Sequence, residues 1–181
     1  MRIIACFKFA LLLLTGCSRP ELKPPHNAEG LEKAPLRVLL PKAEKAHWNA
    51  RGRIEILSFV GGHINDSDLI HVAKLGDLWE LSLIGTSVTD NGLFLLKNNQ
   101  KLQALSIQYS KQVTDEGLAV LMFLPDISTL DLVHTKITDK SVESLICLKS
   151  VSNLFLKGTG ISQEGIVRLK TNLPKCHIQT D

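Results

Sequence analysis

Apolar residues recur along most of the chain in one short pattern, in which three spaced apolar positions are followed by a fourth after a polar turn. One copy of this pattern places them at Leu78, Leu81, Leu83 and Val88. The copies can be aligned on the third apolar position, which falls at Phe59, Leu83, Ile107, Leu132 and Leu156. Successive markers are 24, 24, 25 and 24 residues apart. A period of this length indicates a solenoid of stacked coils.

The spacing of apolar residues changes within each copy. Around the marker, apolar and polar residues alternate with a period of two, as in Leu81 to Leu83, which predicts a strand. After the polar turn the spacing becomes helical, as in Leu118, Leu121 and Leu124. All coils run in the same direction, so we expect a parallel sheet on one face and a helical segment from each coil on the other.

The L-x-x-L-x-L core and the following T-D-x-G-L, seen at Thr89–Leu93, make the chain resemble the leucine-rich repeat family over residues 50–178. The T-D-x-G-L tail is similar to that of ribonuclease-inhibitor-like and F-box-type repeats, and of many bacterial secreted proteins. The resemblance implies an α/β fold, a short horseshoe arc of about five repeats with a concave parallel sheet and convex helices. It implies little about biochemical activity, because these repeats are binding scaffolds in many systems.

A polar residue suited to helix N-capping precedes each helical run; these residues are Asn65, Thr89, Thr114, Thr138 and Ser162. An aspartate follows the first four of them, at Asp66, Asp90, Asp115 and Asp139. Such a row could be taken for a metal or catalytic site, but capping explains both its composition and its position, so we favour a structural role. Small residues two positions later suit close packing between coils; they are Gly92, Gly117, Ser141 and Gly165. Hydroxyl residues follow the strands where many leucine-rich repeats carry an asparagine ladder, at Thr86, Ser110, Thr135 and Thr159.

Residues 1–16 have the features of a secretion signal: basic residues near the start and a short apolar run, Phe9–Leu14, too short to span a membrane. The run leads into Leu14-Thr15-Gly16-Cys17, which resembles a bacterial lipoprotein processing site. That resemblance implies cleavage before Cys17 and acylation of its sulfur and amino group, including a palmitate chain. An ordinary signal peptide that happens to contain Cys17 is the alternative. Ser18, which is not aspartate, favours sorting to the outer membrane rather than the inner membrane.

Three further segments follow the signal. Residues 17–35 are rich in proline and charge, which predicts an extended tether. Residues 36–52 are expected to cap the first coil, with a helix from Lys42 to Trp48 after Pro41 and the Trp48 ring over the coil. A membrane-surface helix is the weaker alternative for this segment. Residues 53–181 form the repeat domain, which we expect to close with a strand within Leu173–Ile178.

Composition and residue chemistry indicate a binding protein rather than an enzyme. Without Arg2 and Lys8 of the signal, 19 basic residues stand against 18 acidic ones, which gives no reason to expect nucleic acid as a partner. The sequence contains no convergent acid–base set, phosphate loop or metal-ligand spacing, so no catalytic residue, metal or cofactor is expected. Cys147 and Cys176 are expected to be two small buried hydrophobic residues, and whether they are free or paired in an oxidising compartment stays open.

A protein partner is expected to contact the concave face, because polar residues alternate there with apolar ones in the manner of protein interfaces. The residues predicted to face it are Glu80, Ser82, Ile84, Ser106, Gln108, Asp131, Val133, Asn153, Phe155 and Lys157. Phe155, the largest, is predicted to be the anchor. The extra residue in the third repeat makes the region around Tyr109 a second candidate contact, although a tolerated insertion is also open. A face that is merely solvated is the other possibility.

The sequence therefore predicts a non-enzymatic protein-interaction module, anchored by lipid to the bacterial cell envelope. The alternative is a structural or scaffolding envelope lipoprotein with no specific small ligand.

Overall fold

The structure is a computed structural model, and it describes Leu22 and residues 33–180. The predicted signal segment 1–16, the lipidation site Cys17 and most of the predicted tether lie outside the described residues. Helix α1 begins at Lys33, so its first turn occupies the last residues of the segment 17–35.

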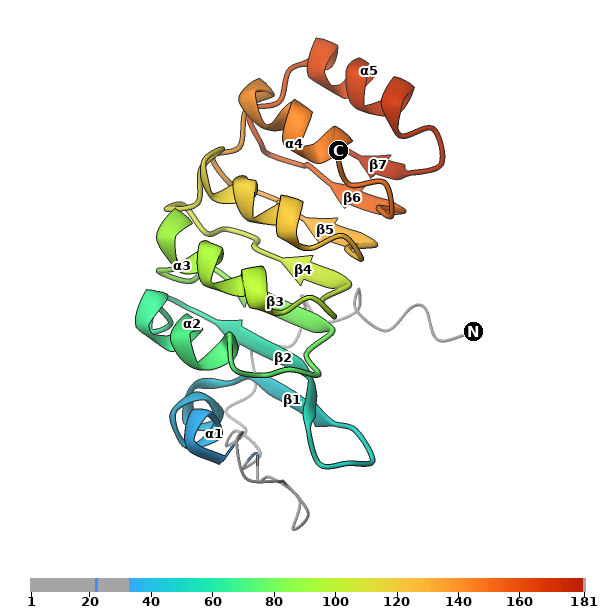
Figure 1. Ribbon diagram of the computed structural model, residues 1–181. Coiled ribbons are helices and arrows are strands. Elements are labelled where there is room, and N and C mark those ends of the chain that lie inside the picture. The colour runs from blue at the N-terminus through green and yellow to red at the C-terminus, as the bar shows by residue number, and fades with distance from the viewer. Residues whose placement is uncertain (1–21, 23–32, 181) are drawn as a thin grey trace, which may run out of the picture.

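A single seven-stranded sheet runs through the structure with its strands in chain order (Figure 1). The first strand pairs antiparallel with the second, and every later pair is parallel. The strands are β1 Lys45–Trp48, β2 Ile54–Val60, β3 Glu80–Ile84, β4 Ala104–Ser106, β5 Thr129–Asp131, β6 Asn153–Phe155 and β7 His177–Gln179. The predicted stack of five parallel repeat strands is therefore confirmed, with one further strand at each end.

The strand register follows from the apolar alternation. Leu57, Leu81, Leu105, Leu130 and Leu154 lie opposite one another across the sheet, and all five are buried. A shift of one residue would turn this column to the solvent face, so burial of the leucines fixes the pairing. The marker residues Phe59, Leu83, Ile107, Leu132 and Leu156 form a second buried column.

Short helices cover one side of the sheet from end to end (Figure 1). They are α1 Lys33–Leu39, η2 Leu40–Lys42, α2 Asp66–Val72, α3 Asp90–Phe94, η3 Leu95–Asn98, η4 Gly117–Phe123, η5 Asp139–Ser141, α4 Val142–Ile146 and α5 Gln163–Asn172. Neighbouring strands lie about 4.8 Å apart, whereas packed helices need about 8 to 10 Å. The helical side is therefore the outer, convex side of an arc, and the opposite face of the sheet is concave.

The aspartate row links each coil to the next. Asp66 accepts hydrogen bonds from the backbone N–H of Thr89, at 2.8 Å, and from its hydroxyl, at 2.7 Å. The aspartates of the next two coils receive the same pair of bonds from Thr114 and Thr138, and Asp139 accepts the N–H of Ser162. We call these four aspartates and their donors the aspartate ladder. The row is structural rather than catalytic, but it joins successive coils, which differs from the predicted role at the start of each helix.

The ladder explains the glycine of the T-D-x-G motif. A Cβ atom at Gly92 would overlap Asp66 Oδ1, and Gly117 and Gly165 stand in the same relation to the preceding aspartates. Ser141 replaces glycine in the fourth coil, and there its hydroxyl donates to Asp115. The residue at these positions is thus small because the aspartate side chain of the preceding coil lies against it.

Three of the five predicted N-cap residues also cap their own helices. Asn65 accepts from Ser67 N, Thr138 from Lys140 N and Ser162 from Gly165 N. Thr89 makes no such bond, and its hydroxyl donates to Asp66 of the preceding coil. In the third coil Thr114 receives a bond from Glu116 N at 3.4 Å, ahead of η4, as long as the bond from Lys140 N to Thr138.

The predicted hydroxyl row at the strand ends satisfies backbone carbonyls. Ser110 donates to Leu83 O at 3.1 Å, and its hydroxyl lies 3.2 Å from that of Thr86. Thr135 and Thr159 each donate to the carbonyl three residues earlier, at 2.6 and 2.7 Å. These bonds remove the cost of burying the strand-end carbonyls.

The N-terminal cap differs from the prediction. The helix expected from Lys42 to Trp48 is wrong, because Lys45–Trp48 form strand β1. The helix lies earlier, at α1, where Leu36 and Leu39 are buried against the first coil. An open edge of β2 offers unpaired backbone groups, and pairing with β1 satisfies them. At the other end, the predicted closing strand is confirmed as β7, with Ile178 opposite Leu154.

Candidate functional site

The residues predicted to contact a partner lie on the concave face, in the register expected of them. Glu80 is opposite Ala104, and Ser82 is opposite Ser106, which is opposite Asp131. Most of them are half-buried, namely Glu80, Ser82, Ile84, Ser106, Gln108, Val133 and Asn153, whereas Lys157 is exposed. The face is therefore accessible over most of its length.

Two residues of this set do not project into solvent as predicted. Phe155 is 9% exposed and Asp131 is 4% exposed. In the sheet Phe155 lies between Asp131 and Gln179, and strands spaced about 4.8 Å apart bring these side chains into contact range. The expectation that Phe155 is a solvent-exposed anchor is therefore wrong.

Asp131 is held by neighbours on its own face. Its carboxylate accepts from Gln108 Nε2 at 2.5 Å and from Val133 N at 3.1 Å. Burial nevertheless raises the pKa of Asp131 above its ordinary value, because it outweighs these two hydrogen bonds. The hydroxyl of Ser106, on the adjacent strand, is buried and has no hydrogen-bond partner in the described structure.

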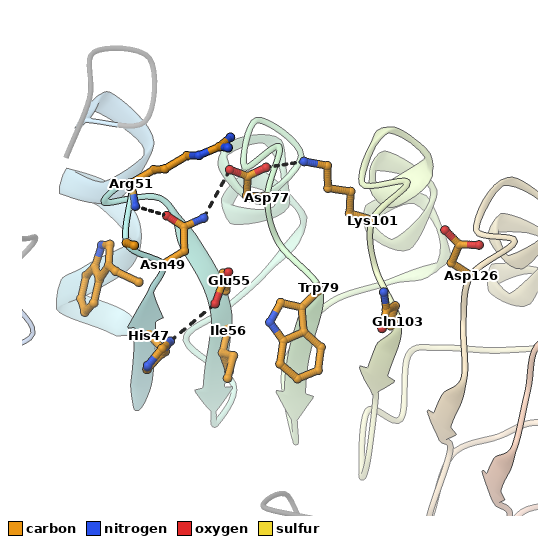
Figure 2. Close-up of a pocket in the computed structure, with 12 residues that line it drawn as sticks. His47, Asn49, Arg51, Glu55, Ile56, Asp77, Trp79, Lys101, Gln103 and Asp126 are labelled. Atoms are coloured by element: carbon orange, nitrogen blue, oxygen red, sulfur yellow. Dashed lines mark hydrogen bonds and ion pairs between the residues drawn. The ribbon is translucent and has the colours of Figure 1, made fainter. Parts of the chain in front are cut away.

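An open groove crosses the concave face where the strands begin, and we call it the tryptophan groove (Figure 2). It has a volume of about 950 Å³. Its lining includes both tryptophans of the chain, Trp48 and Trp79, and the side chains His47, Asn49, Arg51, Glu55, Ile56, Asp77, Lys101, Gln103 and Asp126. It is thus bounded by the β1–β2 hairpin and by the first residues of the next coils.

Trp79 lies in the middle of the tryptophan groove. Its backbone N–H donates to the backbone carbonyl of Glu55 at 2.9 Å, and its backbone carbonyl accepts the backbone N–H of Gln103 at 2.8 Å. These bonds fix the three residues side by side in successive coils. The indole of Trp79 is half-exposed, whereas the Trp48 Nε1–H is buried without a hydrogen-bond partner in the described residues. The groove therefore offers an aromatic surface beside groups able to form hydrogen bonds.

A row of alternating charges forms one rim of the groove. Asp77 binds Lys101 Nζ at 2.5 Å and accepts a hydrogen bond from Asn49 Nδ2 at 3.4 Å (Figure 2). Arg53 Nη1, which is not part of the groove lining, lies 3.6 Å from the same carboxylate. The hydrogen bond from Lys101, followed by the charges of Lys101 and Arg53, lowers the pKa of Asp77 despite its burial. Asp126 extends this row in the following coil. Because its charges compensate one another, the rim favours a partner of mixed polarity over a highly charged one.

Sequence reasoning missed the tryptophan groove. Trp48 was expected only to cover the first coil, and Trp79 was assigned no role. The repeat position that Trp79 occupies carries no shared residue type, as Glu55, Trp79 and Gln103 of successive coils show. The available signal was positional, because residues 24 apart in a solenoid are neighbours in adjacent coils.

Tyr109 lies at the opposite ends of the strands from the tryptophan groove. Its backbone has φ 56°, and His134 of the next coil has φ 55°, where most residues are disfavoured. Their rings stack with centroids 4.8 Å apart, and the ring of His134 lies over Gly158, where a Cβ atom would overlap it. The extra residue of this repeat falls within the exposed pair Lys111 and Gln112. Tyr109 is therefore exposed, as predicted, but belongs to an ordered aromatic stack.

Cys147 and Cys176 are both free. Cys147 is exposed at the end of α4, so the expectation that it is buried is wrong, whereas Cys176 packs partly against the core. Burial raises the pKa of the Cys176 thiol. Within residues 33–180 and Leu22, no group of three or more histidine, cysteine or acidic residues is placed to hold a metal ion. No helix of this described part is long and apolar enough to cross a membrane.

Comparisons with known proteins agree with this geometry. A family model described as a leucine-rich repeat matches residues 98–122 and 124–145. The PEPR1–AtPEP1 crystal structure aligns with 81% of this chain and 24% of that chain, at a TM-score of 0.50 and 14% identity. An identity this low indicates a shared fold alone. No curated protein matches the chain significantly.

Two bacterial structures are also similar. A leucine-rich repeat protein of Leptospira interrogans is 25% identical, with a TM-score of 0.47, over 61% of this chain and 27% of that chain. An internalin from Listeria monocytogenes is 20% identical, with a TM-score of 0.44, over 61% of this chain and 36% of that chain. The chain thus spans between 24% and 36% of the length of these three solved structures.

The periodic coils, the one-sided parallel sheet and the family match over two coils lead to one assignment. The chain has the leucine-rich repeat fold, and two of its coils match the family model; domains of this kind typically serve as protein–protein interaction modules.

Proposed function

We propose that this protein is a non-enzymatic module that binds another protein along the concave face, with the tryptophan groove as the main contact. The single observation that carries the proposal is the half-exposed indole of Trp79, set in an open groove among polar side chains. Tryptophan is enriched among the residues that dominate binding energy at protein interfaces. The half-buried Ile84 and Val133 add apolar contact farther along the same face.

The shape and chemistry of the groove favour a protein over a small ligand. Small-molecule sites are enclosed and bury most of their ligand, whereas this groove is open and continuous with the concave sheet. Its rim carries Asp77, Lys101 and Asp126, whose alternating charges suit the mixed polar rim of a protein interface.

We further propose that the module is held in the bacterial cell envelope by acylation of Cys17, with the outer membrane as its site. The support is the sequence Leu14-Thr15-Gly16-Cys17 after a basic and apolar start. Changing Cys17→Ser should move the product from the membrane fraction to the soluble fraction and remove the acyl mass. Unchanged partitioning, with no acyl mass on the unaltered protein, would exclude this anchor without touching the binding proposal.

A site-specific photo-cross-linker tests the binding proposal in cells. An aryl-ketone amino acid at Gln103, exposed in the groove, should give one discrete cross-linked protein. The matched control carries the same group at Val167, which is exposed on α5, away from the concave face. The Gln103 product should disappear when Trp79→Ala is added.

Two outcomes would contradict the proposal. One is a product at Gln103 that persists with Trp79→Ala, since the indole would then contribute nothing. The other is the same diffuse set of products from Gln103 and Val167. That second result would favour a structural envelope lipoprotein with no specific partner.

A further inference from the structure

The outer side of the arc carries large apolar side chains in solvent. Phe94 and Phe123 are each 42% exposed, Ile70 is 49% exposed and Met122 is 74% exposed. They come from three successive coils, on α2, α3 and η4. Contiguous exposed apolar surface on a soluble domain usually marks an interaction site.

These side chains form one patch. The rings of Phe94 and Phe123 meet edge to face, with centroids 5.7 Å apart. Helix α2 packs against α3, and α3 packs against η4, so Ile70 lies at one end of the patch and Met122 at the other. Lys97 Nζ lies 4.5 Å from the centroid of the Phe94 ring. We call Ile70, Phe94, Met122 and Phe123 the outer patch.

Within the chain segments that carry the outer patch, the charged residues all have one sign. The repeat period aligns three five-residue windows, 70–74, 94–98 and 119–123. These windows contain two lysines, Lys74 and Lys97, and no aspartate or glutamate. The equivalent window of the next coil begins with Glu143, which pairs with Arg168 of the coil after it. The acid-free apolar surface therefore ends at a defined boundary.

The shape of this surface limits what can cover it. The helices lie on the convex side of the arc, so the outer patch bulges outward and cannot enclose an extended peptide or a helix (Figure 1). A lipid bilayer presents a broad surface that accepts shallow insertion of phenylalanine and methionine side chains, with lysines at the phosphate level. The two lysines and the absence of acids complement anionic headgroups.

We propose that the outer patch rests on an anionic lipid bilayer, with Phe94, Met122 and Phe123 inserted at the headgroup level and Lys74 and Lys97 against phosphates. This contact does not depend on acylation of Cys17. It would turn the concave face and the tryptophan groove away from the bilayer, toward a partner. A lysine near an anionic surface contributes about fivefold in binding.

The test uses the full chain with vesicles of phosphatidylglycerol and phosphatidylcholine in equal parts, carrying a trace of phosphatidylglycerol with a diazirine in its acyl chain. Photolysis should attach lipid within residues 94–98 and 119–123, identified by peptide mass spectrometry. The strands β3 to β6 and the control residue Val167, an exposed apolar side chain beyond the Glu143–Arg168 pair, should remain unlabelled. The N-terminal residues are the same in every variant, so labelling there is a constant background.

Two variants sharpen the result. Lys97→Glu should lower labelling of the outer patch by at least fivefold, whereas Lys157→Glu on the concave face should leave it unchanged. Met122→Ser, at a largely exposed position, should abolish labelling in 94–98 without altering the circular dichroism spectrum.

Three outcomes would overturn the proposal. The first is labelling confined to other segments. The second is equal labelling of the outer patch in pure phosphatidylcholine vesicles. The third is an outer patch that stays unlabelled in a chain that sediments as a dimer, which would identify a second copy of the chain as the occupant. Each of these results leaves the proposed use of the concave face standing.

Discussion

Acidic residues lie at both ends of the strands, but they have different bonding partners at each end. In the aspartate ladder, Asp66, Asp90 and Asp115 each receive a backbone N–H and a hydroxyl from the next coil. At the tryptophan groove, Asp77 binds cationic side chains on a solvent-facing rim, and its neighbour Trp79 is only half-buried. The polar groups of the aspartate ladder bond to one another within the domain, whereas the tryptophan groove leaves surface available for contact with a partner.

This contrast separates structural from functional residues by their partners. A carboxylate that accepts backbone N–H groups of the next coil fixes the stacking of the solenoid, and its loss exposes those donors. A side chain that meets only solvent on one side can change without disturbing the stack. Four predictions use this distinction.

The largest change in stability is expected at Phe155, a residue of the concave face that is buried in the structure. Phe155→Ala should lower the free energy of unfolding by about 3 kcal/mol, because a buried ring is lost. Ile84→Ala, a half-exposed neighbour on the same face, is the matched control and should cost less than half as much. Urea denaturation of both variants measures this. If both variants lose equally little free energy of unfolding, Phe155 belongs to the contact surface and not to the core.

The ladder can be broken without touching any of its polar groups. Gly92→Ala places a methyl group against Asp66 and should destabilise the domain by about 1–3 kcal/mol, as overpacking does. Gly76→Ala is its control, since no atom lies within 4 Å of the added Cβ. Thermal unfolding should show a lower Tm only for Gly92→Ala. An unchanged Tm for Gly92→Ala would mean that the aspartate ladder can shift to accept the methyl group without loss of stability.

A smaller effect should appear in the pH dependence of stability. Burial would raise the pKa of Asp115, but the hydrogen bonds from Ser141 and Thr138 outweigh it and lower that pKa. Its contribution is therefore present above the unfolded pKa of about 4 and is lost as the pH falls below that value. Asp131 has a raised pKa, so its contribution is lost as the pH rises from about 4 through the folded value.

The two aspartates should consequently give opposite slopes. Asp115→Asn should flatten the loss of Tm on acidification, and Asp131→Asn should flatten the loss on raising the pH from the acidic side. Melting curves across acidic pH measure both. Parallel shifts of the two variants at all pH values would show that neither carboxylate is perturbed in the folded state.

Most of the fold follows from periodicity alone. The spacing of residues such as Leu81, Leu105 and Leu130 determines strand register, core and coil direction, because only one alignment buries them all. The T-D-x-G motif likewise identified the row that joins the coils. These features repeat, so each copy reinforces the others.

The features that sequence reasoning missed occur once. Lys45–Trp48 forms a strand because it pairs with the edge of β2. This tertiary contact overrides the local preference of the segment for a helix. Trp79 occupies a position whose residue type changes from coil to coil, and its importance comes from the groove around it. The burial of Phe155 depends on its neighbours across the sheet, Asp131 and Gln179.

The most direct test compares Trp79→Ala with Asp90→Ala in two measurements on purified protein: Tm, and affinity for the protein captured through Gln103. The account predicts that Trp79→Ala weakens binding about thirtyfold or more, equivalent to about 2 kcal/mol, while Tm stays close to that of the unaltered protein. Asp90→Ala should lower Tm and leave the affinity of the folded fraction unchanged. A Trp79→Ala variant that binds normally, or that loses stability as Asp90→Ala does, would contradict the assignment of the tryptophan groove as the binding surface.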